Sequence, residues 1–308
     1  MVSEIFRRHL TNLLLKPGVY GASLKRLKVK AVKNQLIQIH SVNMNSWPVP
    51  ISIEKVARKE LGDTLNAFTK LVERISQESK SNDRSFISRI SRHPLSRHDQ
   101  TSDAEFYDFP RFCTHIDDHA INCLSDFYQD NLMENSTIVD LCSSWISHLP
   151  KDKKFHKVIG IGMNKSELDA NKRLDERYVC DLNLNPQLPM LKKDSVDHVL
   201  CAVSIDYLIQ PISIFHEVLR ILKPSSQSTF VISFSNRCFP TKAIRSWLET
   251  DDAGRLGIVS SYFQESNDSN YGSWKNIKVY DLSKDDSDDN PSSSNYTDPL
   301  FVVMGEKC

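Results

Sequence analysis

The feature that most constrains this chain is an alternation of apolar runs and helical patterns between residues 137 and 304. The runs are rich in Val and Ile and short, as buried strands are. We expect strands at 137–141, 157–161, 177–180, 198–203, 229–234, 277–282 and 300–304, and helices at 144–149, 166–174, 211–222, 241–250 and 253–264. Strands that alternate with helices form a parallel sheet covered on both faces. The sequence therefore predicts a doubly wound α/β domain with a mostly parallel, seven-stranded sheet.

The last two of these strands are joined without a helix. Only the Asp-rich segment 283–299 separates them, so we expect them to pair as an antiparallel hairpin at the sheet edge. In doubly wound sheets, ligands bind where the parallel strands end at their carboxyl termini. The loops at that edge are the candidate functional site.

The remaining sequence precedes this domain and predicts an accessory part. Residues 28–42 read as a hairpin, and apolar positions from Ile53 onward recur at helical spacing. We divide the chain into an N-terminal α+β accessory region at 1–78 (helix, hairpin, long helix), a linker at 79–105, a lid-like helical segment at 106–136 that includes a helix at about 117–131, and the α/β domain at 137–308 with its acidic loop at 283–299.

Charge and cysteine content narrow the classes of function. The chain has 39 basic and 39 acidic residues, so its net charge does not point to nucleic acid. Its basic N-terminus is typical of a solvated surface, and contact with RNA or with an anionic membrane is the alternative. The seven cysteines form no CxxC pair, and no apolar run reaches the length of a membrane span, about 18–20 residues. We expect an intracellular, cytoplasmic protein; the basic, amphipathic start leaves a mitochondrial location as the alternative.

Two neighbouring motifs carry a family resemblance. The run Asp194-Ser-Val-Asp-His-Val-Leu is followed by Phe215-His-Glu-Val-Leu-Arg-Ile-Leu-Lys-Pro. Together they resemble the fourth strand and following helix of the type 11 (UbiE-like) group of class I S-adenosylmethionine-dependent methyltransferases. The resemblance spans roughly residues 138–307 and implies the Rossmann-like methyltransferase fold, with S-adenosylmethionine as cofactor.

The resemblance implies a donor site at the carboxyl ends of the first four strands of that domain. The residues it implies are Asp140, Cys142, Ser143, Gly162, Met163, Asn164, Asp181, Leu182, Ala202 and Ser204. Two positions depart from the family. The first loop, 140–145, lacks glycine, and Gly162 stands where an acid usually receives the ribose hydroxyls. Asn164 or Glu167 can substitute for that acid by hydrogen bonding.

The acceptor side is expected to draw on the segment before the sheet and on the later loops. We assign catalytic roles to His115, Asp117 and Tyr207, with His115 or Asp117 as general base. Substrate binding is assigned to Arg111, Asp118, Asn236 and Arg237. The alternative for Asp117 is a helix N-cap. His115, His119 and Cys123 share a helical spacing, but no fourth ligand is evident, so we expect no metal site.

Two hypotheses of different class follow. The first is an enzyme that transfers a methyl group to a small-molecule acceptor, with a protein or RNA acceptor as the alternative. The second is a catalytically inactive methyltransferase fold that acts as a scaffold or partner subunit, since the donor motifs diverge. A nicotinamide or flavin site is disfavoured, because the glycines near Gly160 follow the second strand rather than opening the first helix.

Overall fold

The computed structural model describes residues 51–56, 95–283 and 297–308, of which 51–56 are described by their backbone alone. All of these lie in one compact unit, Val49–Cys308. The expected N-terminal helix, the hairpin at 28–42, most of the long helix after Ile53 and most of the acidic loop fall outside the described residues.

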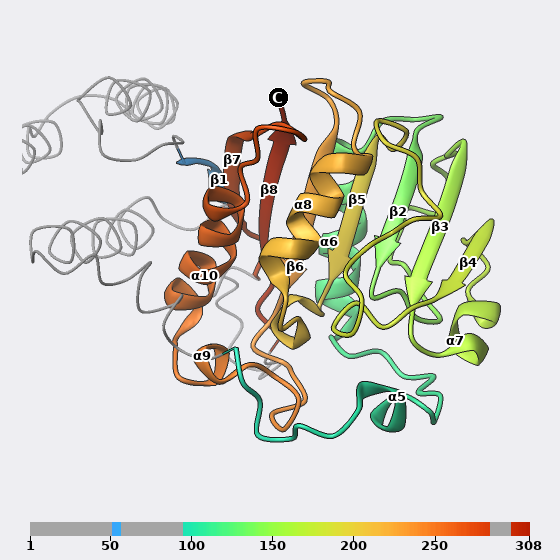
Figure 1. Ribbon diagram of the computed structural model, residues 1–308, viewed down its shortest axis with the longest axis vertical. Coiled ribbons are helices and arrows are strands. Elements are labelled where there is room, and N and C mark those ends of the chain that lie inside the picture. Colours follow the sequence, from blue (N-terminus) through green and yellow to red (C-terminus); the bar gives the residue numbers. More distant parts are fainter. Residues whose placement is uncertain (1–50, 57–94, 284–296) are drawn as a thin grey trace, which may run out of the picture. The chain divides into compact units, whose positions relative to one another are not determined.

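The described residues form one mixed sheet with helices on both faces (Figure 1). The elements are β1 (Ile51–Val56), α5 (Asp103–Phe106), α6 (Asp118–Asn131), β2 (Thr137–Leu141), β3 (Lys157–Gly162), α7 (Lys165–Ala170), β4 (Glu176–Val179), β5 (His198–Ala202), the 3-10 turn η1 (Ile205–Tyr207), α8 (Pro211–Ile221), β6 (Thr229–Phe234), α9 (Arg245–Leu248), α10 (Asp252–Glu265), β7 (Trp274–Asp281) and β8 (Phe301–Lys307). The strand order is β1-β7-β8-β6-β5-β2-β3-β4. β8 runs antiparallel to both of its neighbours, and the other pairings are parallel.

This arrangement confirms the doubly wound, Rossmann-like fold and all seven expected strands. β7 and β8 form the expected antiparallel pair. Among the described residues there is also an eighth strand, β1, which pairs in parallel with β7 and lies outside the hairpin. The prediction that a helix begins at Ile53 is therefore wrong, because residues 51–56 gain backbone partners along β7.

The two faces of the sheet bury separate apolar clusters. Adjacent residues of a strand point to opposite faces, and in β2 Val139 packs on the side of α8 and α10, whereas Ile138 packs on the side of α6 and α7. Phe215 of α8 lies at the centre of the first cluster, with its ring 4.9 Å from those of Phe230 and Phe263. Figure 1 shows α8 in front of the sheet and α6 behind it.

The helix that carries the family resemblance is held by its own motif residues. α8 begins with Pro211 at its first turn, where a missing N–H costs nothing. Glu217 forms an ion pair with Arg220 at 2.9 Å. Arg220 also donates to the carbonyls of Leu188 and Leu191, so this pair anchors the loop that leads into β5. The Glu and Arg of this motif thus have a structural role here.

Three expected helices are absent or shorter. Residues 144–149 are not helical, because the hydroxyl groups of Ser143 and Ser147 both donate to Asp140 and hold an irregular turn. Side chains of this kind compete with the helical backbone. α7 ends at Ala170 rather than residue 174, where the Asn171 side chain accepts from Arg173 N. α9 covers only Arg245–Leu248 of the helix expected at 241–250.

Candidate functional site

The candidate site is the edge of the sheet where the parallel strands β2 to β6 end. The loops that leave these strands gather there, and the segment 95–117, which includes α5, runs across that edge (Figure 1). We call residues 95–117 the lid segment. Hydrogen bonds join it to the loops after β2, β3 and β4. The bond to the loop after β2 runs from Trp145 Nε1 to Cys113 O at 3.0 Å, and the others are described below.

The loop after β2 turns its acid inward. Asp140 is buried, and its carboxylate accepts hydrogen bonds from Ser143 at 2.6 Å and Ser147 at 2.7 Å. Burial raises the pKa of Asp140 to about 6, although the two hydroxyl donors oppose this. The Asp140 carboxylate therefore holds residues 143–147 of the loop after β2 in place through these two hydrogen bonds.

Gly162, at the end of β3, shows why the family's acid is missing. A Cβ atom at this position would lie 2.0 Å from the carbonyl oxygen of Ser143. Ser143 is held there because its N–H donates to Ile161 O at 2.8 Å. The preceding residue, Cys142, has a positive φ of 54°, which brings the loop back over β3. Only glycine fits beneath this backbone.

Asn164 and Glu167, the two expected substitutes for the acid, bind the lid segment. Asn164 caps α7 by accepting from Glu167 N, and its amide group donates to Tyr107 O at 2.8 Å and Asp108 O at 3.1 Å. Glu167 accepts from Arg111 N at 2.6 Å and from the Ser144 hydroxyl. Both amide hydrogens of Asn164 are thus used within the protein, as is each carboxylate oxygen of Glu167.

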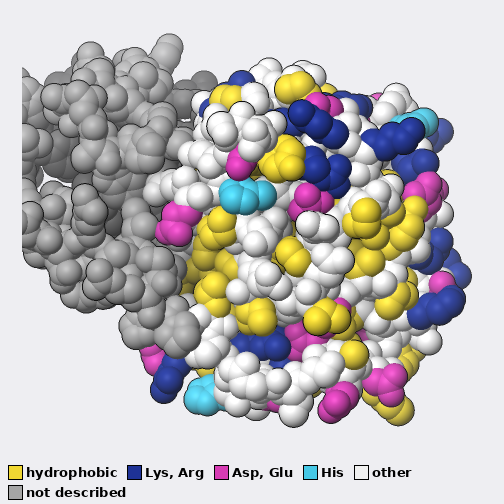
Figure 2. Space-filling view, viewed as in Figure 1, with side chains coloured by type: hydrophobic (Ala, Val, Ile, Leu, Met, Phe, Trp, Pro, Cys, Tyr) yellow, Lys and Arg dark blue, Asp and Glu magenta, His cyan; other side chains and the backbone are white. Residues whose placement is uncertain are grey.

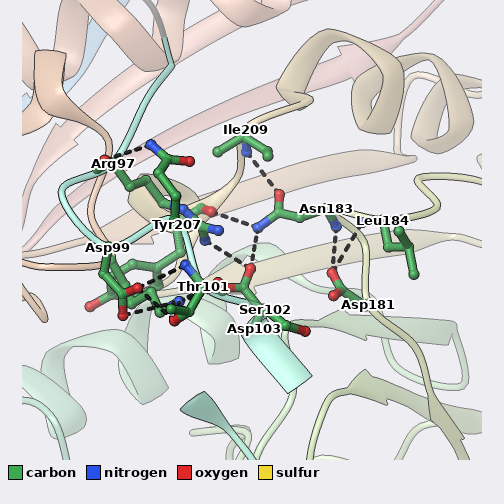
Figure 3. A network of polar contacts seen from close by, with 12 residues as sticks. Arg97, Asp99, Thr101, Ser102, Asp103, Asp181, Asn183, Leu184, Tyr207 and Ile209 are labelled. Carbon is green, nitrogen blue, oxygen red and sulfur yellow. Dashed lines mark hydrogen bonds and ion pairs between the residues drawn. The ribbon is translucent and has the colours of Figure 1, made fainter. Parts of the chain in front are cut away.

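The loop after β4 holds a polar network that the sequence did not reveal (Figure 3). Asp181 accepts from the backbone N–H groups of Asn183 and Leu184, at 2.9 and 3.1 Å, which forms a tight turn. Asn183 donates to Asp103 of the lid segment and to Tyr207 O, and it accepts from Ile209 N, all at 2.8 Å. One amide therefore connects the loops after β4 and β5 with the lid.

A buried cluster of charges fastens the other end of the lid segment. Lys242, after β6, is fully buried and lies 3.2 Å from Asp99 and 3.3 Å from Asp103. Arg97 completes the cluster with a 2.8 Å bond to Asp103. Burial opposes ionisation of Asp103, but the donors Arg97 and Asn183 outweigh it and lower its pKa. We call Arg97, Asp99, Asp103 and Lys242 the ion cluster.

The expected acceptor residues of the lid segment lie in different settings. Asp117 is the N-cap of α6, as the alternative interpretation held. The backbone N–H of Asp117 donates to the Asp298 carboxylate, and the backbone N–H of Asp298 donates to the Asp117 carboxylate. Asp118 is exposed in the first turn of that helix. The Arg111 guanidinium lies 4.4 Å over the Phe106 ring and donates to Phe106 O. His115 lies edge-on to Phe239, 5.4 Å between centroids.

The pKa shifts separate these candidate bases. Partial desolvation lowers the pKa of His115, although the Glu167 carboxylate opposes this. The imidazole is therefore neutral near pH 7 and can accept a proton. For Asp117, desolvation is outweighed by the N–H donors of Ala120 and Asp298, which lower its pKa and weaken it as a base.

The expected residues after β5 and β6 face different surroundings. Tyr207 accepts a hydrogen bond from Phe239 N at 2.8 Å. This bond uses the hydroxyl oxygen as an acceptor and does not use the hydroxyl's own proton. The Ser204 hydroxyl donates to Ala202 O at 2.9 Å. Arg237 is 64% exposed and its Nε lies 3.8 Å from Asp298. Other expected residues are buried or half-buried at the same edge: Cys142, Met163, Leu182 and Asn236.

Asp206, in η1, is a buried carboxyl that the sequence reasoning did not single out. Its exposed fraction is 3%, and burial raises its pKa from 3.8 to about 8. No pattern marks it, because a lone Asp after a strand is indistinguishable from a turn residue. Its environment comes only from the packing of distant segments.

This burial predicts a pH dependence of stability that Asp206→Asn removes. A carboxyl with a raised folded-state pKa is protonated in the folded protein and ionised in the unfolded chain between about pH 4 and pH 8. The unfolding free energy of the wild type should therefore fall relative to the variant across that range and level off above it. Each pKa unit corresponds to about 1.4 kcal/mol, so several kcal/mol are at stake. Urea unfolding of both proteins from pH 5 to 9 measures the difference, and a constant difference contradicts the prediction.

No metal site is found where the structure describes the chain. His119 and Cys123 approach to 3.6 Å, but no group of three His, Cys, Asp or Glu within the described ranges is arranged to hold an ion. Nor is any described helix long and apolar enough to cross a membrane.

Comparison with known proteins identifies part of this region. The sequence model of the methyltransferase domain family matches residues 141–230, from the end of β2 to the start of β6. No curated protein sequence matches the chain.

Solved structures resemble the chain at low identity. A putative methyltransferase of Haloferax volcanii, in complex with the Trm112 methyltransferase activator, is 16% identical with a TM-score of 0.41, over 61% of this chain and 90% of that one. A SAM-dependent methyltransferase of Aquifex aeolicus is 14% identical with a TM-score of 0.41, over 62% and 92%. Phosphoethanolamine N-methyltransferase 2 of Haemonchus contortus is 12% identical with a TM-score of 0.41, over 60% and 52%. Likenesses at this level carry no information on activity.

The family match covers the loops that leave β2, β3, β4 and β5, which are the loops that build the candidate site. Residues 141–230 therefore match the methyltransferase domain family, and the family resemblance of the sequence is confirmed for this part of the chain.

Proposed function

We propose that this domain is an S-adenosylmethionine-dependent methyltransferase that acts on a small-molecule acceptor. One observation carries the proposal: the family match includes every loop at the carboxyl ends of β2 to β5. In a doubly wound sheet this edge is where ligands bind. The lid segment across it can enclose a small ligand and exclude water, which favours methyl transfer over loss of the group to solvent.

The residues present suit the adenine and amino-acid parts of S-adenosylmethionine better than its ribose. On the adenine side, Asp181 presents a carboxylate in a tight turn, and Leu182, Ala202 and Ser204 line the neighbouring strand ends. On the amino-acid side, Cys142, Ser143 and Met163 offer loop backbone. The ribose side differs, since Gly162 has no carboxylate and Asn164 is engaged with the lid. When bound, S-adenosylmethionine would supply an electrophilic methyl group on its sulfonium.

The chain's own residues then position the acceptor and handle its proton. His115 is a neutral imidazole on the lid and is our candidate general base. Tyr207, in η1 after β5, lies 6.0 Å from Phe239, the ring that His115 also contacts. Arg111, Asp118, Asn236 and Arg237 are the proposed acceptor-contacting residues. Asp117 is held as a helix cap, so we propose for it a supporting role. Most of the rate enhancement would come from proximity and orientation.

A scaffold function is the second candidate, and a specific contact favours it. The Ser143 carbonyl lies where a side chain on Gly162 would stand, and the lid uses Asn164 and Glu167 as anchors. A domain fixed in this state would keep the fold and lose the donor. This is the form a catalytically inactive partner subunit would take.

Calorimetry with S-adenosylmethionine and S-adenosylhomocysteine separates the two candidates. We expect micromolar binding that weakens about tenfold in Asp181→Ala, since a carboxylate hydrogen bond is lost. Asp169→Ala is the matched control, because Asp169 is an exposed acid on α7 paired only with Lys165 among the contacts described. Absence of binding at millimolar ligand would favour the scaffold.

A further inference from the structure

Residues 104–115, the middle of the lid segment, differ from its two ends, and we call them the strap. Each residue of the strap is exposed or half-buried, and Phe109 and Phe112 are 79% and 55% exposed. The flanking residues are buried: Asp103 belongs to the ion cluster, and Ile116 packs in the apolar cluster under α6. A segment with few buried contacts opens at a lower free-energy cost than the core around it. The strap can therefore move while both of its ends stay fixed.

The contacts that hold the strap against the domain come from separate loops. Trp145, after β2, donates from its indole nitrogen to Cys113 O at 3.0 Å, and its ring meets Phe112 edge-on at 6.5 Å between centroids. Phe239, after β6, meets the Phe106 ring at 5.4 Å. The remaining contacts are hydrogen bonds to Asn164 and Glu167, and these have a consequence for the donor.

The strap gives its backbone to the two residues that can replace the missing ribose-binding acid. Asn164 donates to the carbonyls of Tyr107 and Asp108, and Glu167 accepts from the N–H of Arg111 at 2.6 Å. The strap thus presents two acceptors and one donor. A ribose diol can present the same set, because each hydroxyl donates one hydrogen bond and accepts others. Strap and ribose would therefore use the same atoms of Asn164 and Glu167.

We propose that the strap is an autoinhibitory contact, which the ribose of S-adenosylmethionine displaces from Asn164 and Glu167. The inference rests on the proposed function and adds to it a regulation of the same site. Both side chains are buried and already bonded to the strap, so they cannot bind the ribose at the same time. The apparent affinity for the donor then equals the intrinsic affinity multiplied by the open fraction. Because its ends remain tied, the displaced strap can still cover an acceptor.

Loosening the strap should therefore tighten the binding of S-adenosylhomocysteine, whereas loosening a lid that closes over its ligand would weaken it. Trp145→Phe removes the indole bond to Cys113 O and keeps an aromatic ring beside Phe112. Calorimetry on the whole protein should show binding about two- to tenfold tighter, the effect of removing one hydrogen bond from the closed state. Trp274→Phe is the matched control. It removes a 2.9 Å indole bond to Ser266 at the edge opposite the site and should leave the affinity unchanged.

Hydrogen exchange tests the same proposal without a substitution. The amide of Arg111 is bonded to Glu167 when the strap is closed, so strap amides should exchange faster when S-adenosylhomocysteine is bound, while those of β2 and β5 do not. Slower or unchanged exchange in the strap, or binding to Trp145→Phe no tighter than to the wild type, overturns the inference. Phe112→Ala, an exposed position on the strap, should act in the same direction and replaces Trp145→Phe if that variant does not fold.

A different result tests the function on which the inference rests. If S-adenosylhomocysteine does not bind the wild type at millimolar concentration and does not bind Trp145→Phe or Phe112→Ala either, the donor site itself is absent, and the proposed function fails together with the inference. If it binds only the two variants, the strap excludes the donor from the wild type, and both the proposed function and the inference are supported.

Discussion

Lys242→Met is expected to destabilise the protein by about 3–5 kcal/mol, the usual effect of removing one partner from a buried ion pair. Lys242 is fully buried, and its ammonium donates to Thr101 O at 2.7 Å while facing Asp99 and Asp103 at 3.2 and 3.3 Å. Methionine fills a similar volume but leaves these acids with less compensation. Urea unfolding followed by fluorescence measures the loss.

The same variant should loosen the lid segment before the sheet. Lys242 joins Asp99, Thr101 and Asp103 to the loop after β6, beside a backbone hydrogen bond from Asp99 N to Thr241 O at 2.8 Å. Without its ammonium, backbone amides of the lid should exchange hydrogen faster, while those of β2 and β5 stay protected. Arg245→Met is the matched control, because the Arg245–Glu249 pair is about half exposed and such pairs contribute about 0–1 kcal/mol. If Lys242→Met costs no more than that control, the ion cluster does not hold the lid.

The sheet could be predicted because its central strands β2, β5 and β6 are buried on both faces. A run such as Thr137-Ile-Val-Asp-Leu must be covered on each side, and few folds other than a doubly wound sheet accomplish this. α8 was predictable for a similar reason, since its apolar positions recur along one face and Pro211 marks its start. In both cases the signal is local in the sequence.

The lid contacts could not be predicted, because their partners lie far apart in the chain. Thr101 and Lys242 are 141 positions apart, and Asn183 meets Asp103 across 80. Hydrogen bonds of serine, aspartate and asparagine side chains also made a helix prediction from local spacing wrong. The segment 144–149 has helical spacing, yet Asn171 of another loop donates to Ser144 O and Ser147 Oγ and holds it in an irregular turn.

The donor loop illustrates a further limit of sequence reasoning. The missing acid at Gly162 was visible as a departure from the family, but its cause was not. Glycine is required at position 162 because the carbonyl of Ser143 occupies the space that a side chain would need. The backbone conformation of Gly162 is not the reason. The same contact distinguishes the two candidate functions, an active enzyme and a scaffold.

Gly162→Asp restores the family's acid, and we expect it to destabilise the protein by about 3 kcal/mol or more without creating a donor site. The new Cβ atom would lie 2.0 Å from Ser143 O, a backbone atom that cannot rotate away. The loop 142–144 would have to leave its hydrogen bond to Ile161 O. Thermal unfolding gives the stability change, and calorimetry with S-adenosylmethionine gives any change in affinity.

Gly160→Ala provides the matched comparison on the same strand. Its Cβ would meet Leu174 Cδ1 at 2.4 Å, but this is the end of a flexible side chain that can change rotamer. The cost should therefore be clearly smaller than at Gly162, where backbone must move. Should Gly162→Asp prove as stable as Gly160→Ala and bind the donor more tightly, the loop after β2 moves freely. The closed arrangement of Ser143 over β3 would then be one state of a working donor site, and the case for a scaffold would lose its main support.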